Sequence, residues 1–285
     1  MGMLVEHTID TPGEVRDTGP MPPARCRPRR PAAVAAVTAG LLLALALLWP
    51  DPAAARGAPL PVPGFRAAEV VEPAAAPAGP RPVVVALHGN FDRPEWNCET
   101  LPALVQGRAW ILCVRGNPRQ DTPKSWDRWT YSSRQRVLQE IDAGLAALKA
   151  RHPGRVDPAT PLLAGFSLGA IYSARFAVAR PDRFPRLYLV EGSHKIWTLA
   201  AMRRFARKGG RAVLFGCGRK GCGAWSRRIC KGLTRLGAWC AEVTVPELGH
   251  SYTEPLPTRA LPGFREMLAA DPRWGIAPPG SRSKE

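Results

Sequence analysis

A serine flanked by glycines is the residue of this chain best placed for chemistry. Residues 165–169 read GFSLG, a G-x-S-x-G pattern with Ser167 at its centre. The apolar run before it predicts a buried strand, and the residues after it predict a helix. A sharp turn between the two would strain the serine backbone and hold its hydroxyl above the edge of the sheet, where it could act as a nucleophile. The structural alternative is a serine that only satisfies its own turn.

A serine hydroxyl becomes a strong nucleophile only when a nearby base takes its proton. Among the five histidines, His250 is the predicted base, because it lies in a polar loop after the last predicted strand. Such loops emerge at the same edge of a parallel sheet as Ser167. A structural loop histidine is the alternative for this position. His194 is the reserve candidate, and His88 is expected to orient the loop that follows it.

Alternating strands and helices have to position these side chains. The predicted strands are 82–89, 109–116, 161–165, 186–192, 211–216 and 240–245. The predicted helices are about 99–107, 133–151, 168–179, 197–207, 223–236 and 258–269. Continuous apolar strands that alternate with amphipathic helices predict a single α/β domain over residues 81–270. We expect a three-layer sandwich with a mostly parallel central sheet, helices on both faces and no large lid.

The order of these motifs resembles that of the α/β-hydrolase fold superfamily. An HG loop (87-LHGN-90), the G-x-S-x-G turn and a late G-H-S follow one another, and the chain is most similar to exported, lidless esterases of the carboxylesterase, thioesterase and depolymerase type. The resemblance covers about residues 81–270 and implies a nucleophile–acid–histidine order. It also implies an oxyanion hole made by the backbone N–H groups of Asn90 and Leu168, with Phe91 as the neighbouring candidate.

The acid of the triad departs from the usual pattern of this superfamily. The loop that ordinarily supplies it, 216-GCGRKGCG-223, contains two basic residues and no carboxylate. Some relatives place the acid one strand earlier, which here selects Glu191. Glu247, a plain Ser–His dyad, and a purely structural pairing of Glu191 with an arginine are the alternatives. Some group must hold the tautomer of His250 and stabilise its cation.

The long loop after the second strand supplies the candidate substrate wall. Trp126, Trp129 and Tyr131 in this loop, together with Phe91, could line an acyl or aromatic pocket. Packing anchors are the alternative for such aromatic residues. The loop also carries three basic residues that could favour an acidic substrate: Arg119, Lys124 and Arg128.

The first 55 residues resemble a secretory leader. A basic cluster at 25–30, an apolar run at 32–49 and an A-x-A at 53–55 follow in the order of a signal peptide. Met21 is the expected true start, and an uncleaved membrane anchor is the alternative. Residues 56–80, rich in Ala and Pro, are expected to form a linker or an edge segment. Residues 271–285 are expected to form a loose tail.

Six cysteines follow the leader, and an even number in an exported chain predicts disulfides. The expected pairs are Cys98–Cys113, Cys217–Cys222 and Cys230–Cys240. A zinc site around 217–222 is the alternative, which the poor ligand spacing and the predicted export disfavour.

The formal net charge of the whole chain is +17. This charge could favour anionic partners, but the basic residues are scattered and no nucleic-acid partner is expected. The sequence therefore predicts a secreted or periplasmic serine hydrolase that acts on a small-molecule or polymer ester through an acyl-enzyme. No metal or organic cofactor is required, and membrane contact is expected only through an uncleaved N-terminal segment. A peptidase or amidase, and a non-catalytic binding protein with the same fold, are the alternatives.

Overall fold

The computed structural model describes residues 57–74 and 79–276. Outside these ranges lie residues 1–56, which include the predicted leader, residues 75–78 of the Ala/Pro-rich segment, and residues 277–285 of the predicted tail. Within the described ranges, no helix has the length and apolar character needed to cross a membrane.

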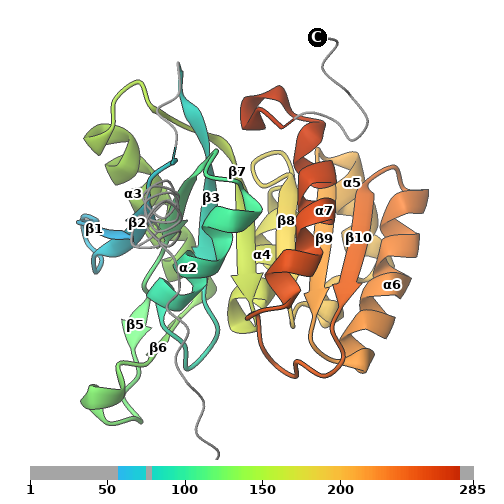
Figure 1. Cartoon of the computed structure of the whole chain (residues 1–285), viewed down its shortest axis with the longest axis horizontal. Helices are drawn as coiled ribbons and strands as arrows, with labels where there is room; N and C mark the ends of the chain where they lie inside the picture. Colours follow the sequence, from blue (N-terminus) through green and yellow to red (C-terminus); the bar gives the residue numbers. More distant parts are fainter. Residues whose placement is uncertain (1–56, 75–78, 277–285) are drawn as a thin grey trace, which may run out of the picture. The chain divides into compact units, whose positions relative to one another are not determined.

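An eight-stranded sheet forms the centre of the domain (Figure 1). Its strands, from one edge to the other, are β1 (Ala58–Leu60), β2 (Ala68–Val71), β4 (Trp110–Cys113), β3 (Arg81–Leu87), β7 (Val156–Phe166), β8 (Arg186–Val190), β9 (Ala212–Cys217) and β10 (Trp239–Thr244). The six strands from β4 to β10 are parallel, and β1 and β2 join antiparallel at the edge. The predicted mostly parallel sheet is confirmed, and part of the Ala/Pro-rich segment forms its edge strands.

Helices cover both faces of this sheet. The apolar side chains of α3 (Arg134–Arg151), α4 (Leu168–Ala179), α5 (Leu199–Arg207) and α6 (Lys220–Arg235) belong to one core cluster. Those of α2 (Pro94–Leu104) and α7 (Leu256–Ala269) belong to a second cluster, and these two helices lie in front of the sheet in Figure 1. The three-layer architecture therefore follows the prediction.

Local sequence signals explain where helix α3 begins and which of its sides is buried. The side chain of Ser133 caps the helix by accepting a hydrogen bond from the Arg136 N–H. Val137, Ile141 and Leu148 are buried at helical spacing against the sheet. Helix α2 differs from the prediction, because it begins at Pro94 instead of about residue 99. Proline is favoured in the first helical turn, where its missing N–H has no intrahelical acceptor.

The first part of the predicted loose tail is packed onto the domain. Residues Pro272–Trp274 form a 3-10 turn, and Trp274 is fully buried. Oδ2 of Asp271 lies 3.1 Å from Nη1 of Arg186 in an ion pair, and Oδ1 of Asp271 accepts a hydrogen bond from Nε of Arg273. The expectation of a loose segment is therefore wrong for residues 271–276.

Three disulfides join the six cysteines in the predicted pairs. Cys98 of α2 is bonded to Cys113 of β4, Cys217 of β9 to Cys222 of α6, and Cys230 of α6 to Cys240 of β10. Each bond ties a helix to a neighbouring strand. The Cys217–Cys222 bond closes the loop that lies next to the candidate site.

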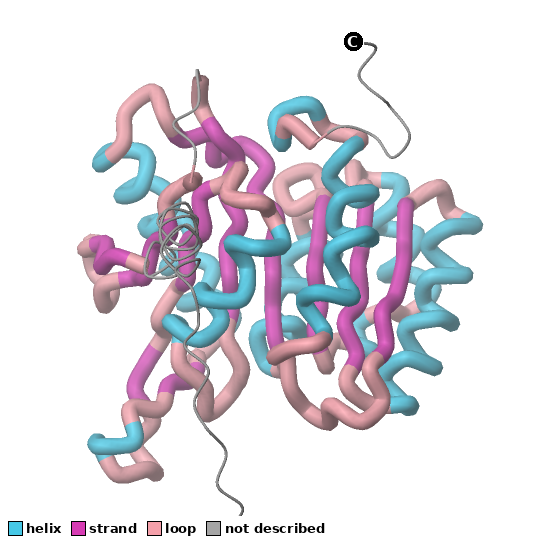
Figure 2. The backbone as a smooth tube through the Cα atoms, in the orientation of Figure 1, coloured by secondary structure: helices cyan, strands magenta, loops and turns pink. Residues whose placement is uncertain are grey.

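The carboxyl ends of the parallel strands meet at one edge of the sheet. The loops after β7, β8, β9 and β10 lie at the lower edge in Figure 2. Ser167, Glu191 and His250 are placed by three of these loops, so the topology alone brings them to the same side of the sheet.

Candidate active site

Ser167 occupies the turn between β7 and α4. Its φ angle is +51°, a left-handed value that side-chain-bearing residues rarely adopt, and its N–H donates to the Val190 carbonyl at 2.9 Å. The flanking glycines are required by space. A Cβ at Gly169 would collide with the Leu87 carbonyl, and one at Gly165 would lie 2.5 Å from the backbone of Gly169. The two glycines of the G-x-S-x-G pattern therefore allow strand, turn and helix to lie this close.

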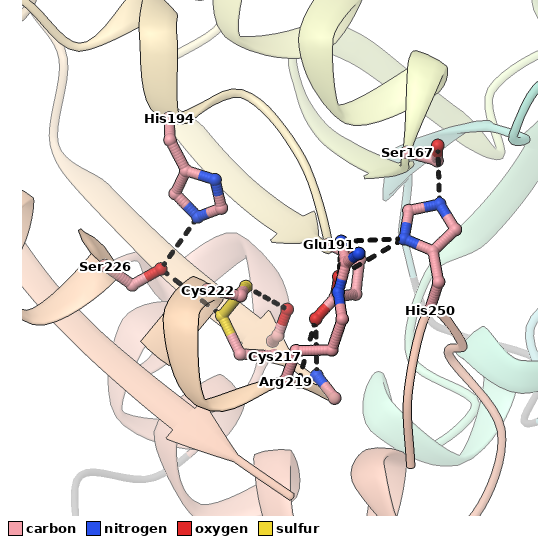
Figure 3. Close-up of polar contacts among 10 residues, drawn as sticks. Ser167, Glu191, His194, Cys217, Arg219, Cys222, Ser226 and His250 are labelled. Carbon is pink, nitrogen blue, oxygen red and sulfur yellow. Dashed lines mark hydrogen bonds and ion pairs between the residues drawn. A yellow bond between two sulfur atoms is a disulfide. The ribbon is translucent and has the colours of Figure 1, made fainter. Parts of the chain in front are cut away.

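A line of polar contacts runs from Ser167 through His250 to Glu191 (Figure 3). Nε2 of His250 lies 2.9 Å from the Ser167 hydroxyl oxygen, and Nδ1 lies 3.2 Å from Oε2 of Glu191. The Glu191 side chain is completely buried, whereas that of His250 is 45% exposed. An imidazole between a hydroxyl and a carboxylate can accept a proton on the nitrogen that faces the hydroxyl. The nitrogen that faces the carboxylate keeps its own proton, which is hydrogen-bonded to the carboxylate.

The loop that lacks a carboxylate contributes to the site by binding the carboxylate of Glu191. Oε1 of Glu191 accepts hydrogen bonds from the backbone N–H groups of Gly218, at 2.7 Å, and Arg219, at 3.1 Å. Oε2 accepts a bond from Nε of Arg219 at 2.7 Å, and Nη2 of the same guanidinium is also paired with it. Four donors from one loop therefore fix the orientation of a buried carboxylate that sits at the end of the previous strand.

Arg219 and Glu191 favour opposite tautomers of His250. Nη2 of Arg219 lies 3.1 Å from Nδ1 of His250 and can only donate to it, which requires Nδ1 to carry no proton. Glu191 can only accept, which requires a proton on the same nitrogen. Only the second tautomer leaves Nε2 free to accept the proton of Ser167. The guanidinium thus stabilises the position of the acid but competes with its effect on the imidazole.

We expect Arg219→Ala to lower the free energy of unfolding by about 1–3 kcal/mol, because a buried carboxylate loses a charged donor. We also expect it to raise kcat for a hydrolysed ester about two- to tenfold, because the screened repulsion between a guanidinium and an imidazolium is on the order of 1 kcal/mol. Denaturant unfolding and steady-state kinetics measure the two effects. Lys220→Ala, which changes the next exposed basic residue, is the matched control. A tenfold fall in kcat would show that the anchoring of Glu191 outweighs the competition.

Among the described residues, no acceptor is found for the backbone N–H of Asn90 in the HG loop or for that of Leu168 at the start of α4. These are the two predicted oxyanion donors. The N–H of Phe91, the neighbouring candidate, donates to the Trp129 carbonyl at 3.0 Å and is therefore occupied. The Asn90 side chain anchors the loop, since its Oδ1 accepts bonds from Arg119 at 2.6 Å and Thr130 at 2.7 Å.

The buried side chain of His88 contacts the backbone of the same loop. Its ring nitrogens lie 2.7 Å from the Gly89 carbonyl and 2.9 Å from the Arg115 carbonyl, and its ring stacks on Tyr131. Burial lowers the pKa of His88. A neutral imidazole has one N–H and donates to one of these two carbonyls. The position agrees with the expected role in orienting the loop.

The reserve candidates do not join the line of contacts. Nε2 of His194 lies 3.4 Å from the Ser226 hydroxyl, and its ring is turned away from Ser167 in Figure 3. His194 also lies close to Cys217 and Cys222, but these two sulfur atoms are bonded to each other and offer no thiolate to a metal. Glu247 is exposed, and no hydrogen bond between it and His250 occurs in the described part of the chain.

The predicted aromatic wall divides into an exposed and a buried pair. Phe91 and Trp126 are 41% and 52% exposed and meet edge to face, with ring centroids 6.1 Å apart. Trp129 and Tyr131 are buried: Trp129 donates to Asp127 at 2.8 Å, and the Tyr131 hydroxyl accepts a bond from the His88 N–H at 3.0 Å. For Trp129 and Tyr131 the expectation of a pocket wall is corrected, because both act as packing anchors.

The basic residues of the same loop are largely engaged within it. Arg119 forms an ion pair with Asp121, and Arg128 donates to the Trp126 carbonyl at 2.8 Å. Their guanidinium groups lie over the Phe91 ring, at 5.1 and 5.7 Å from its centroid.

Sequence reasoning missed a hollow of about 520 Å³ next to the serine turn. Its walls include Ile171 and Arg175 of α4 and Trp225 of α6. One signal for it is present in the sequence, because Ile171 and Arg175 follow Ser167 at intervals of four residues and so share a face of the predicted helix. The contribution of α6 comes from a distant part of the chain and has no such signal.

The strand order and the strand–serine–helix turn together define the α/β-hydrolase fold, and this chain has that fold. No family model and no curated protein sequence matches it.

Solved structures of similar architecture are distant in sequence. An uncharacterized protein from Bacillus cereus ATCC 10987 is 14% identical, with 69% of this chain and 62% of that chain covered and a TM-score of 0.51. The Bacterial Heroin Esterase is 16% identical, with 84% and 90% covered and a TM-score of 0.48. The Bacillus cereus carboxylesterase is 15% identical, with 66% and 89% covered and a TM-score of 0.46. At such identities the similarity concerns the fold alone.

Proposed function

We propose that this chain is a serine hydrolase that cleaves carboxylic esters through an acyl-enzyme on Ser167. The observation that carries the proposal is the continuous line from the Ser167 hydroxyl through both nitrogens of His250 to the buried carboxylate of Glu191. A serine that only satisfied its turn would not need a left-handed φ of +51° or an imidazole 2.9 Å from its hydroxyl.

The proposed reaction has two halves. In the first, Nε2 of His250 takes the hydroxyl proton while Oγ of Ser167 bonds to the ester carbonyl carbon, and the N–H groups of Asn90 and Leu168 stabilise the resulting oxyanion. The carbon–oxygen bond to the alcohol then breaks, and His250 returns the proton to the departing oxygen. In the second half, water attacks the acyl-enzyme by the same proton transfers, and the free acid leaves.

Glu191 has a supporting role in this scheme. Its carboxylate holds the proton on Nδ1 of His250 and stabilises the imidazolium that forms when Ser167 is deprotonated. The donors from Gly218 and Arg219 keep the carboxylate in place, so it does not need to reorganise during the reaction.

Esters are the proposed substrates because an alcohol leaves with less help from a general acid than an amine does. The general acid in this scheme is the His250 imidazole, and its side chain is 45% exposed to solvent. The three disulfides support a further proposal, that the protein is secreted or periplasmic, since such bonds persist in oxidising compartments. Tethering to a membrane by the N-terminal apolar segment is the alternative.

A panel of para-nitrophenyl esters and matching para-nitroanilides of graded acyl length tests the substrate class. We expect the esters to be hydrolysed and each anilide to react at least about a hundredfold more slowly, a difference of about 2.7 kcal/mol in activation free energy. Faster cleavage of the anilides would assign the protein to the amidases. Absence of hydrolysis in both series, with no labelling of the folded protein by a fluorophosphonate, would favour the non-catalytic binding protein.

A further inference from the structure

The hollow beside the serine turn starts at the backbone of the proposed nucleophile. Gly192 lines it, and a Cβ at this glycine would lie only 2.5 Å from the Ser167 carbonyl oxygen. The volume of about 520 Å³ lies within the range of small-molecule sites, roughly 300–1,000 Å³. The hollow therefore begins directly beside the backbone of Ser167, although Ser167 itself does not line it.

One face of helix α4 leads from the nucleophile to a cation. Ile171 and Arg175 lie four residues apart on one face of α4, which begins directly after Ser167, and both line the hollow. At a rise of 1.5 Å per residue, Arg175 lies about 10 Å along the helix axis from Leu168, the first residue of α4. Ile196 and Trp225 add apolar surface, and the Trp225 side chain is 55% exposed. Along α4, the apolar side chain of Ile171 therefore lies nearer to Ser167, and the guanidinium of Arg175 follows one turn later.

The polar side chains of the hollow are all able to donate hydrogen bonds. Arg175 and Lys195 are exposed cations, and no carboxylate lines the hollow to neutralise them. The Ser193 side chain, 4% exposed, lines the same space with a buried hydroxyl that has no hydrogen-bond partner. An unpaired buried hydroxyl is unfavourable unless a ligand satisfies it. Burial lowers the pKa of His194, which leaves its imidazole neutral at neutral pH.

We propose that this hollow binds the acyl group of the substrate, and that the acyl chain is apolar next to the ester carbonyl and ends in an anionic group near Arg175 and Lys195. The inference rests on the proposed function. The acyl side is assigned because no residue of the loop that carries His250 lines the hollow. The alcohol oxygen must lie beside His250 to receive its proton, so the alcohol leaves on the other side.

The test compares two esters of equal chain length, mono-para-nitrophenyl suberate, which ends in a carboxylate, and para-nitrophenyl octanoate, which ends in a methyl group. We expect kcat/KM of the wild type to be about tenfold higher for the suberate, because two partly exposed charged donors face its carboxylate. In the double variant Arg175→Gln/Lys195→Gln the ratio should fall to near one. Added salt should reduce the wild-type ratio as well.

Arg259→Gln is the matched control, since Arg259 is an exposed arginine on α7, whose side chains pack into the other core cluster. It should leave the ratio unchanged. A wild-type ratio of one or less, or a ratio that survives in the double variant, would overturn the inference while leaving the esterase proposal intact.

A binding measurement separates failure of the proposed esterase function from failure of the proposed acyl site. If neither ester is hydrolysed, calorimetry with Ser167→Ala protein and monomethyl suberate decides between the two statements. Binding that is at least fivefold tighter than that of dimethyl suberate, and that the double variant loses, supports the anionic acyl site. Equal or absent binding overturns it.

Discussion

Replacing Ser167 by alanine should reduce ester hydrolysis by about 10⁴-fold or more, the scale of loss when a serine nucleophile is removed from a triad. The hydroxyl is the group that His250 contacts at 2.9 Å, and alanine cannot replace it. Folding should be little affected. Both residues carry a Cβ, so alanine meets the same backbone strain at φ +51°. Steady-state kinetics and thermal unfolding measure the two quantities.

Ser173→Ala provides the control for this variant. Ser173 is a buried serine on α4, the helix that begins directly after Ser167, and its hydroxyl has no hydrogen-bond partner. It should keep a rate close to that of the wild type. Retention of more than a tenth of the activity in Ser167→Ala would show that another group performs the attack.

Glu191→Gln should reduce kcat by about 10³- to 10⁴-fold, as loss of the charged triad acid does elsewhere. The amide oxygen of glutamine can still accept the bonds from the backbone N–H groups of Gly218 and Arg219, so its NH₂ group would face His250 and would lose the bonds from the Arg219 guanidinium. That group donates to Nδ1 and selects the tautomer in which Nε2 carries the proton and cannot accept another. The variant therefore changes the proton positions with little change in shape.

The matched control for Glu191→Gln is Glu247→Gln, which alters the rival carboxylate near His250 in the sequence. Glu247 is exposed, and its replacement should change the rate less than about twofold, as surface substitutions usually do. A large loss in Glu247→Gln together with an active Glu191→Gln would transfer the role of the acid. Wild-type activity in both variants would support a Ser–His dyad.

Regular patterns along the chain predicted the sheet, its helices and the serine turn. The apolar strands and the glycines at 165 and 169 are signals that act within a few residues, and the structure shows the steric contacts that require them. The absence of a carboxylate from the usual loop points to Glu191. The structure adds that this loop contributes four donors to Glu191.

Features that depend on contacts between distant segments could not be read in this way. Trp129 and Tyr131 lie in a loop with no period, and both contact residues far away in the sequence: the Arg66 guanidinium lies 5.5 Å from the centroid of the Trp129 ring, and the Tyr131 hydroxyl accepts a bond from the His88 N–H. Trp274 is buried although its neighbours in sequence suggest a loose tail. The competition between Arg219 and Glu191 for one nitrogen of His250 depends on side-chain positions that spacing does not determine.

Peptide mass spectrometry of the protein after treatment with a fluorophosphonate tests the central claim most directly. The account predicts a single covalent adduct on the peptide that contains Ser167. Its formation should be lost in Ser167→Ala and strongly slowed in His250→Ala, because the imidazole must take the hydroxyl proton. An adduct on another residue, or a folded wild-type protein that the reagent leaves unmodified, would contradict the assignment of Ser167 as the nucleophile.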